Sequence, residues 1–257
     1  MKDLSVFDLT GKASVVTGGC AGLGLTFAEA LAEAGANVVL GDIIANTPKG
    51  AEAVERIKKL GVKCFSVQSD VSKEADCQAL IDTAVREFGR IDILVNNAGI
   101  SGDGKRVTDL SLDMWEKVMA VNLRSAFLCS RAAAKYMIAQ KEGKIINISS
   151  ASSFKAVSGL AAYATTKAGM IMLTKTLAVE LGRFNIQVNA LAPGYLLTDL
   201  NRAHFESEAG KKQIEGFSGM KRLGTPEELK GLIIMLASRA SSFVTGASIV
   251  ADGGQWL

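Results

Sequence analysis

Short apolar runs rich in β-branched residues alternate along the chain with longer segments of helical periodicity. The apolar runs lack the alternation of apolar and polar residues that marks a strand with one face in water. They are therefore typical of a parallel sheet that helices cover on both sides. We expect strands over residues 13–17, 37–41, 63–68, 92–96, 144–149, 187–191 and 248–251. The pattern predicts an α/β fold with a doubly wound parallel sheet of about seven strands.

The composition favours one ordinary globular domain. Hydrophobic residues make up 48% of the 257 residues and charged residues 21%, which excludes a disordered chain. No linker-like stretch or repeat divides the sequence, so we expect a single domain over residues 1–257, with residues 196–220 as its least regular segment. The formal net charge of +3 is small and its charges are interspersed, so no nucleic-acid partner or anionic membrane surface is predicted.

Cysteine and histidine are too few and too scattered to suggest a metal site. The four cysteines show no CxxC spacing, and the single histidine, His204, leaves little material for a zinc site or a Ser/His/Asp triad. Residues 1–12 lack the long apolar core of a signal peptide, and no run approaches the ~18 apolar residues of a membrane span. We therefore expect a soluble cytoplasmic protein with reduced cysteines and no bound metal.

Glycines follow several of the predicted helices. Gly35, Gly61, Gly89 and Gly143 each lie just after a helical segment, where a left-handed C-cap favours glycine. We expect each of them to end a helix.

The first predicted strand runs into a glycine-rich turn, Thr17-Gly18-Gly19-Cys20-Ala21-Gly22-Leu23-Gly24, and then into a helical segment over residues 25–34. Glycines at such a junction let the backbone approach a pyrophosphate closely, and the free N–H groups of the helix point at it. The spacing is GxxxGxG rather than the commoner GxGxxG. Its place after the first strand favours a dinucleotide site over a plain tight turn.

The second predicted strand ends in an acid, Asp42, about 20 residues beyond the glycine turn. A carboxylate there would accept hydrogen bonds from the ribose hydroxyls of an adenosine, or it is simply a solvated loop acid. It would repel a 2′-phosphate at 4 Å by roughly 4 kcal/mol at an effective dielectric constant of 20. Lys49, the first cationic residue after Asp42, could reach such a phosphate from a flexible loop. The sequence therefore predicts NAD in preference to NADP.

A tyrosine and a lysine four residues apart, Tyr163 and Lys167, share one face of a predicted helix. Bringing the pKa of a phenol from about 10 down to 7 requires roughly 4 kcal/mol of extra stabilisation of the phenolate. The lysine cation and an oxidised nicotinamide could supply that stabilisation. The structural alternative is a tyrosine at the edge of the core with a solvated amine beside it.

Two other predicted strands end in polar residues at the same carboxyl edge of the sheet. One ends in Ser149-Ser150 and the other in Asn96-Asn97-Ala98-Gly99. Doubly wound sheets bind ligands at this edge, so Ser150 could hydrogen-bond a substrate oxygen. Both segments also fit an ordinary turn.

An asparagine, Asn122, lies on the apolar face of a predicted helix that also carries Trp115, Val118 and Cys129. A buried amide must find hydrogen-bond partners. Asn122 is thus either a satisfied polar group of the core or a residue that bends the helix or holds a water beside Lys167.

Together these motifs resemble, in order and spacing, those of the short-chain dehydrogenase/reductase family over residues 11–254: TGxxxGxG, NNAG, a mid-helix Asn, Ser150, YxxxK and Pro193-Gly194. The resemblance implies a single-domain Rossmann-fold oxidoreductase, a homotetramer that interconverts a secondary alcohol and a ketone by hydride transfer without a metal. It implies that Tyr163 is the general acid or base and that Ser150 orients the substrate oxygen. It implies that Lys167 holds the nicotinamide ribose and lowers the pKa of the tyrosine, and that Asn122 retains a proton-relay water.

The resemblance also implies a set of cofactor contacts. The matching positions are Gly18, Gly22, Leu23 and Gly24 at the pyrophosphate, Asp42 at the ribose, Asp70 and Val71 at the adenine, Asn96, Ala98 and Gly99 beside the adenosine, Tyr163 and Lys167 at the nicotinamide ribose, and Pro193, Gly194, Leu196 and Thr198 at the nicotinamide amide. Thr165-Thr166 replaces the small-residue pair that is frequent inside YxxxK, which leaves the catalytic spacing unchanged.

Within the family, residues 7–12 and the ending Asp252-Gly253-Gly254-Gln255-Trp256 are similar to those of sugar-acid and polyol dehydrogenases of the gluconate and deoxygluconate type. We expect substrate choice to reside in residues 101–106, 151–160 and 200–220. Phe205, Phe217 and Met220 suggest a partly apolar substrate-binding lid within residues 196–220. The helices over residues 111–140 and 162–183 resemble the subunit interface of the family.

Three functions are consistent with these residues. The first is an NAD-dependent dehydrogenase or reductase acting on a sugar acid, polyol or similar small molecule. The second is a 3-oxoacyl-[acyl-carrier-protein] reductase, whose relatives generally prefer NADP and whose basic docking surface would draw on Lys135, Lys141 and Lys144. The third is a non-catalytic dinucleotide-binding regulatory protein, which the complete set of catalytic positions disfavours.

Overall fold

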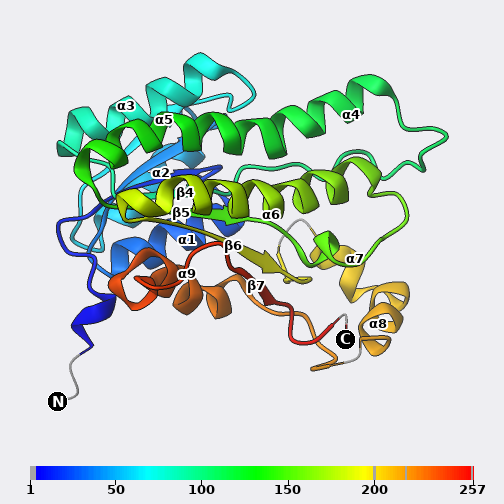
Figure 1. Ribbon diagram of the computed structural model, residues 1–257. Coiled ribbons are helices and arrows are strands. Elements are labelled where there is room, and N and C mark those ends of the chain that lie inside the picture. Colours follow the sequence, from blue (N-terminus) through cyan, green and yellow to red (C-terminus); the bar gives the residue numbers. More distant parts are fainter. Residues whose placement is uncertain (1–3, 199–200, 218, 256) are drawn as a thin grey trace.

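The structure, a computed structural model, describes residues 4–198, 201–217, 219–255 and 257. Its centre is a seven-stranded parallel sheet with the strand order β3-β2-β1-β4-β5-β6-β7 (Figure 1). The strands are β1 (Ala13–Thr17), β2 (Asn37–Asp42), β3 (Cys64–Gln68), β4 (Ile93–Asn96), β5 (Gly143–Ile148), β6 (Ile186–Pro193) and β7 (Ser248–Ala251). The predicted doubly wound sheet is confirmed, with each strand close to its expected bounds.

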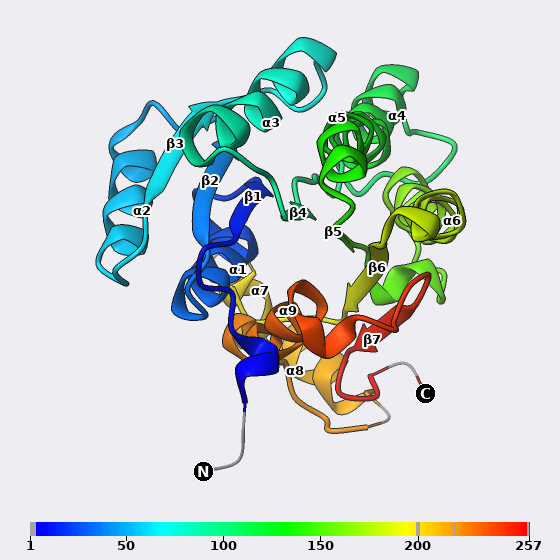
Figure 2. The same cartoon turned by 60° about the vertical axis from the view of Figure 1, so that its left-hand side comes forward.

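Helices cover both faces of the sheet, as Figure 2 shows in a view along the strands. The helices are α1 (Gly22–Glu33), α2 (Pro48–Lys58), α3 (Glu74–Phe88), α4 (Leu112–Met119), α5 (Ser125–Gln140), α6 (Ala161–Leu181), α7 (Arg202–Glu206), α8 (Glu208–Glu215) and α9 (Lys230–Ala237). Helices α1 and α9 pack together on one face, and α3, α5 and α6 lie on the other. No helix in the described part of the chain combines the length and apolarity needed to cross a membrane.

Adjacent residues of β1 belong to different hydrophobic cores. Val16 packs in the core under α1 and α9, which includes Leu31 and Leu236. Val15 packs in the core under α3, α5 and α6, which includes Leu80 and Met137. Strands β1, β4, β5 and β6 are buried along their whole length, whereas the edge strands β3 and β7 are partly exposed. The strand sequences are therefore apolar on both sides because helices cover both faces of the sheet.

Three of the four glycines that we expected to end helices do so. Gly35, Gly61 and Gly89 have φ values of +100°, +87° and +76°, in the left-handed region that favours glycine. The prediction for Gly143 is wrong, because this residue begins β5 and Lys141, with φ +56°, is the left-handed C-cap of α5. A Cβ at position 143 would overlap the Met137 side chain, so glycine is needed there for close packing of strand and helix.

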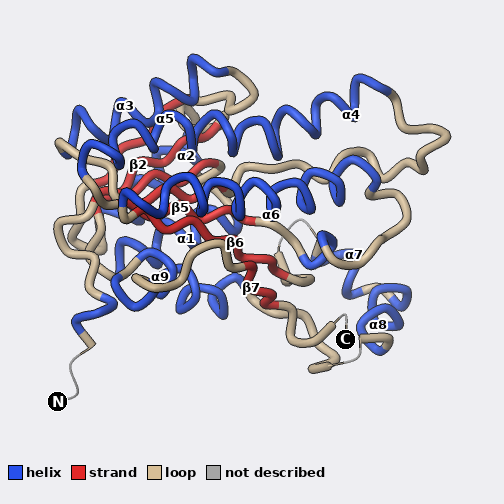
Figure 3. The backbone as a smooth tube through the Cα atoms, viewed as in Figure 1, coloured by secondary structure: helices blue, strands red, loops and turns tan. Residues whose placement is uncertain are grey.

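The parallel strands end at the edge of the sheet near which α7 and α8 lie, at the right of Figure 3. The loops that follow β4, β5 and β6 leave from this same carboxyl edge. Some predictions fall in part outside the described residues: positions 199, 200 and 218 belong to the predicted lid 196–220, and Trp256 belongs to the C-terminal resemblance.

Candidate active site

A cleft of about 760 Å³ opens at the carboxyl edge of the sheet. This is the edge at which doubly wound sheets bind ligands. The predicted site residues that line it are Leu23, Gly99, Ser150, Tyr163, Lys167, Pro193, Gly194, Leu196 and Thr198. The predicted serine, tyrosine and lysine thus share one cleft with the segment expected at the nicotinamide.

Ser150 and Tyr163 interact at the floor of this cleft. Tyr163 lies in the first turn of α6, and its side chain is hydrogen-bonded to that of Ser150. Ser150 also caps the short turn Ala151–Ser153, because its Oγ accepts a hydrogen bond from the Ser152 N–H at 3.1 Å. This serine therefore caps a turn and also lines the cleft, and its contact with a substrate oxygen stays a prediction.

Burial raises the pKa of the Tyr163 phenol above its ordinary value, the Ser150 hydrogen bond opposes this rise, and Tyr195 adds to it. The ammonium of Lys167 lies over the Tyr163 ring, with Nζ 5.6 Å from the ring centroid, and its effect on the pKa of the tyrosine with a nicotinamide bound stays a prediction. The chain by itself holds Tyr163 as a phenol, the form that donates a proton.

Lys167 is buried at the inner end of the cleft. Its Nζ donates to the Ile148 carbonyl oxygen at 2.7 Å, and the Ser149 hydroxyl donates to the Lys167 carbonyl oxygen at 2.8 Å. Burial lowers the pKa of Lys167 to about 8. An ammonium group carries three donors, so hydrogen-bonding capacity remains for the hydroxyls of a ligand.

Asn122 lies in the π-helical turn Ala120–Arg124, which separates α4 from α5 and interrupts the helix expected over residues 111–140. Its amide exchanges two hydrogen bonds with the backbone of Ile100: the N–H of Ile100 donates to Oδ1 at 2.8 Å, and Nδ2 donates to the carbonyl at 2.9 Å. Nδ2 also donates to Thr166 Oγ1 at 3.2 Å, and that hydroxyl donates to the Tyr163 carbonyl oxygen at 2.7 Å. The buried amide therefore joins the loop after β4 to the first turn of α6.

Gly99 lies beside both Asn122 and Lys167. A Cβ at this glycine would lie 3.4 Å from Asn122 Oδ1 and 3.5 Å from Lys167 Nζ. Thr166, which the sequence argument treated as a neutral replacement, belongs to the same network. Thr166 stands next to Lys167 in the sequence, but this position alone does not reveal its hydrogen bond to Asn122.

The glycine turn is built to admit a phosphate group. Gly18 and Gly22 have φ values of +62° and +51°, and a Cβ on Gly24 would overlap the Gly18 carbonyl oxygen. The N-cap residue of α1, Ala21, makes no side-chain hydrogen bond to the first N–H groups of the helix. The positive end of α1 is thus left for an anionic ligand, which fits the pyrophosphate of a dinucleotide.

Asp42 is the last residue of β2 and lies beside this turn. Its Oδ2 accepts from the Cys20 N–H at 3.0 Å, and its Oδ1 accepts from the Ile44 N–H at 3.2 Å. Lys49 lies in the first turn of α2, whose N-cap Thr47 accepts from the backbone N–H at position 50. Lys49 is thus part of a capped helix, and the flexible loop expected for it is not found.

The remaining predicted cofactor residues do not line the cleft. Asp70 follows β3, and hydrogen bonds from Ser72 hold the pKa of its carboxyl below the ordinary value. Val71 is buried against the core under α3. Ala98 packs against the same core, and its N–H donates to Thr17 Oγ1 at 3.0 Å.

The side chain of Asn96 faces the core. Its Nδ2 donates to Asn147 Oδ1 at 2.8 Å and to Ser130 Oγ at 3.0 Å. Its neighbour Asn97 lines the cleft instead, and donates through Nδ2 to the Thr17 carbonyl oxygen at 2.9 Å. Asn97 was not among the predicted cofactor residues, although it stands in the same NNAG motif.

Tyr195 and Phe205 belong to the outer wall of the cleft, whereas Phe217, which was expected in the lid, packs on Tyr195 without lining the cleft. Tyr195 stacks on Phe217, with ring centroids 5.9 Å apart, and packs edge-on against Phe205 at 5.5 Å. Met220, expected beside these rings, lines a second cavity of about 180 Å³ together with Arg222 and does not line the cleft.

The outer wall also contains polar residues of the segment 200–220 that were not singled out from the sequence, namely Asn201, His204 and Gln213. The sequence did not mark His204 as a site residue, because a single histidine suggests neither a metal site nor a catalytic triad. His204 directly precedes Phe205 in the short helix α7, and this position gives no signal of a cleft wall, since only the packing of α7 and α8 brings it there.

Comparison with known proteins agrees with this geometry. The family model described as "Enoyl-(Acyl carrier protein) reductase" matches residues 18–255. The 2-dehydro-3-deoxy-D-gluconate 5-dehydrogenase of Escherichia coli (strain K12) is 42% identical over 255 residues, which cover 99% of this chain and 98% of that protein.

Two solved structures are also similar. The crystal structure of a gluconate 5-dehydrogenase from Burkholderia cenocepacia J2315 in complex with NADP and tartrate has a TM-score of 0.91 at 41% identity and covers 98% of both chains. The structure of an NAD⁺-bound xylitol dehydrogenase has a TM-score of 0.89 at 33% identity and covers 96% of this chain and 99% of that one. Similarity that extends along nearly the whole sequence and fold shows that this chain belongs to the short-chain dehydrogenase/reductase family and is an oxidoreductase acting on CH–OH groups.

Proposed function

We propose that the protein is an NAD-dependent dehydrogenase that interconverts a secondary alcohol and a ketone on a sugar acid, with Tyr163 as general acid and base. The observation that carries this proposal is the hydrogen-bonded pair of Ser150 and Tyr163 in the cleft that Lys167 also lines. The Escherichia coli and Burkholderia relatives are named for gluconate derivatives, and a third relative for a polyol. These names support a polyhydroxylated substrate.

The chemistry requires one proton to move at the substrate oxygen. The nicotinamide cofactor would accept the hydride as NAD during oxidation and supply it as NADH during reduction. During reduction the Tyr163 phenol donates its proton to the ketone oxygen, and during oxidation the phenolate takes the hydroxyl proton. The Ser150 hydroxyl would orient the same oxygen, and the ammonium of Lys167 would donate to the nicotinamide ribose hydroxyls. Asn122 acts as a positioning residue, because it ties Ile100 and Thr166 together behind the site.

The cofactor proposal rests on the glycine turn and Asp42. The uncapped first turn of α1 would hold the pyrophosphate, and Asp42 would accept from the adenosine ribose hydroxyls. The other proposed contacts are Leu23, Asp70, Val71, Ala98, Gly99, Pro193, Gly194, Leu196 and Thr198. A carboxylate at position 42 disfavours a 2′-phosphate, so we propose NAD, although the Burkholderia structure holds NADP.

The segment 196–220 is proposed as the substrate-binding lid. Asn201 fixes its start, because its Nδ2 donates to the Leu196 carbonyl oxygen at 2.7 Å and its Oδ1 accepts from the Thr198 N–H at 2.8 Å. Farther along, His204 and Phe205 line the cleft. Loops at the carboxyl edge of such sheets commonly close over substrates.

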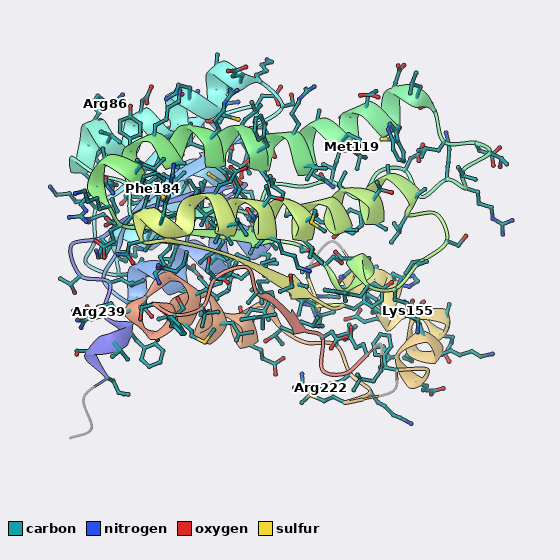
Figure 4. The ribbon with its side chains drawn as sticks, viewed as in Figure 1. Arg86, Met119, Lys155, Phe184, Arg222 and Arg239 are labelled. Carbon is teal, nitrogen blue, oxygen red and sulfur yellow. The ribbon has the colours of Figure 1, made fainter. Side chains whose placement is uncertain are left out.

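A homotetramer is proposed from the outer surface of the helices. A groove of about 410 Å³ runs between α4, the π-helical turn, α5 and α6, and is lined in part by Met119, Leu123, Phe127 and Leu173. Met119 is labelled in Figure 4, on the side of the molecule away from α9. Apolar surface of this kind is typical of subunit interfaces. Light scattering should give a mass near four chains, and a monomer would contradict the proposal.

The four free, buried cysteines support a reducing compartment, and we propose the cytoplasm.

The alternative function, a carrier-protein reductase, is disfavoured by the positions of the three lysines predicted for its docking surface. Lys144 is buried and its Nζ donates to Ser241 Oγ at 3.1 Å. Lys135 and Lys141 lie at the end of α5, just before β5 begins, and so at the edge of the sheet opposite the cleft. The non-catalytic alternative has no gap in the catalytic set to support it.

The test is a screen for turnover, read as absorbance of the reduced nicotinamide, with NAD or NADP and a panel of sugar acids and polyols. We expect turnover with NAD on at least one sugar acid. Failure on every sugar acid, with NAD binding shown separately by fluorescence, would contradict the proposed function.

A further inference from the structure

We propose that His204, held in place by Gln213, binds the carboxylate of the substrate at the mouth of the cleft and so selects sugar acids over neutral polyols. This inference rests on the proposed function and adds to it the residue that recognises the acid group.

The cleft offers few groups that can balance a negative charge. Among the described residues that line it, only Lys167 and His204 have side chains that can carry a positive charge. Lys167 is buried beneath Tyr163 and donates to the Ile148 carbonyl oxygen, so it belongs to the reacting end of the cleft. His204 is exposed on α7 and lines the outer wall. Lys167 thus lies at the reacting end of the cleft, and His204 lies at its mouth.

Other cations at this end of the molecule do not line the cleft. Lys155 and Arg222 are labelled near α7 and α8 in Figure 4. Arg222 lines the second cavity and forms an ion pair with Glu228 at 2.7 Å. Lys155 is not among the residues that line either cavity. An acid group in the cleft therefore has His204 as its ionic partner.

The remainder of the wall suits the hydroxyl groups of a sugar chain. Ser101, Ser152 and Ser158 line it with hydroxyls, and Asn201 and Gln213 line it with amides. Such neutral groups exchange hydrogen bonds with a polyol but leave the cost of removing a carboxylate from water largely unmet. The acid group therefore needs the imidazole, whereas the rest of the substrate does not.

His204 is held in a defined position. Its Nε2 lies 3.1 Å from Gln213 Oε1, and because an amide oxygen only accepts, Nε2 carries the hydrogen of this bond. Nδ1 is then left for the ligand, and it donates when the ring is protonated. The ring packs edge-on against Phe205, with centroids 4.9 Å apart, and Phe205 in turn is buried against Tyr195.

The backbone of α7 is fixed as well. The Ser207 hydroxyl donates to the His204 carbonyl oxygen at 2.6 Å, and a Cβ on Gly210 would overlap that same oxygen. Helix α8 therefore lies directly against α7 and presents Gln213 to the imidazole. Such preorganisation is what a specificity contact requires.

The experiment compares D-gluconate with D-sorbitol, which share a six-carbon polyol chain and differ in the carboxylate. KM and kcat are measured with NAD for the intact enzyme and for His204→Gln, which keeps a hydrogen-bonding side chain but removes the charge. Gln213→Glu places a carboxylate beside the imidazole and competes with the substrate. Lys212→Gln is the control, because it removes an exposed charge next to Gln213 without touching the cleft.

We expect His204→Gln and Gln213→Glu each to raise KM for gluconate at least tenfold, with kcat and the KM for NAD within about twofold. Any activity on sorbitol should not change, and Lys212→Gln should behave as the intact enzyme. An unchanged KM for gluconate in both variants, or an equal loss on gluconate and sorbitol, would overturn the role of His204 while leaving the proposed function intact. Absence of turnover on every sugar acid in the intact enzyme would overturn both.

Discussion

Burial acts in opposite directions on the pKa values of the two residues that the sequence pairs most clearly. It raises the pKa of Tyr163 and lowers that of Lys167 to about 8, because a poorly solvated site favours the neutral form of each. The YxxxK spacing places these side chains on one face of α6, but it cannot report how deeply either is buried. The sequence therefore predicts that the two side chains lie together, and the burial that acts on both pKa values comes only from the fold.

Ser150 offers a direct test of this electrostatic account. Its hydrogen bond lowers the pKa of Tyr163, so Ser150→Ala should raise that pKa further. Oxidation of the alcohol uses the phenolate, and its kcat/KM should rise with pH as the phenol ionises. In Ser150→Ala this rise should move to higher pH, in addition to an overall loss of rate. Steady-state pH profiles measure the shift, and an unchanged profile position would be inconsistent with the account.

Lys144 is a buried lysine with no part in the proposed chemistry. Burial lowers its pKa from 10.5 to about 8, so between these pH values the unfolded chain binds more protons at this residue than the folded protein. Its contribution therefore makes the free energy of unfolding rise with pH through that window. Replacing it by methionine should remove this rise and stabilise the protein at pH 7 by up to about 3 kcal/mol.

Denaturant titrations of the intact protein and of Lys144→Met at pH 7 and pH 10 measure this effect. Ser241 keeps a partner in the variant, because its hydroxyl also donates to the Leu236 carbonyl oxygen at 3.0 Å. A variant that is less stable than the intact protein at pH 7 would show that the Lys144–Ser241 hydrogen bond outweighs the cost of burying the ammonium.

At the scale of the elements, the junctions between strands and helices position the site. The first turn of α1, the end of β2 and the first turn of α6 were each expected from the sequence, because glycine, a terminal acid and helical periodicity mark them. The π-helical turn at Asn122 was anticipated only as a bend. Its partner Ile100 lies in the loop after β4, and no local pattern links the two residues.

The start of α1 gives a prediction that depends on backbone geometry alone. A Cβ on Gly24 would overlap the Gly18 carbonyl oxygen, so Gly24→Ala should distort the turn and weaken NAD binding at least tenfold. Gly231→Ala, on α9, is the matched control, because a Cβ there meets nothing within 4 Å. Titration of NAD by fluorescence compares the two variants. Equal affinities in Gly24→Ala and Gly231→Ala would show that the turn does not hold the cofactor.

For the whole molecule, the parallel sheet with its two covered faces and its glycine turn could be predicted from periodicity, because buried strands and amphipathic helices leave local patterns. The outer wall of the cleft could not. His204, Gln213 and Tyr195 come together through the packing of α7 and α8 against the loop after β6, and each residue taken singly looks ordinary. The reason for the glycine at position 143 could not be predicted either, because it allows close packing against Met137 and does not end a helix.

The central claim is that Tyr163 transfers the proton in an NAD-dependent reaction. The most direct measurement is the turnover of Tyr163→Phe with an active sugar acid, together with its affinity for NAD. Removing the hydroxyl while keeping the ring should lower kcat by about 10²- to 10⁴-fold and leave NAD binding nearly unchanged. Turnover within a few-fold of the intact enzyme would contradict the account.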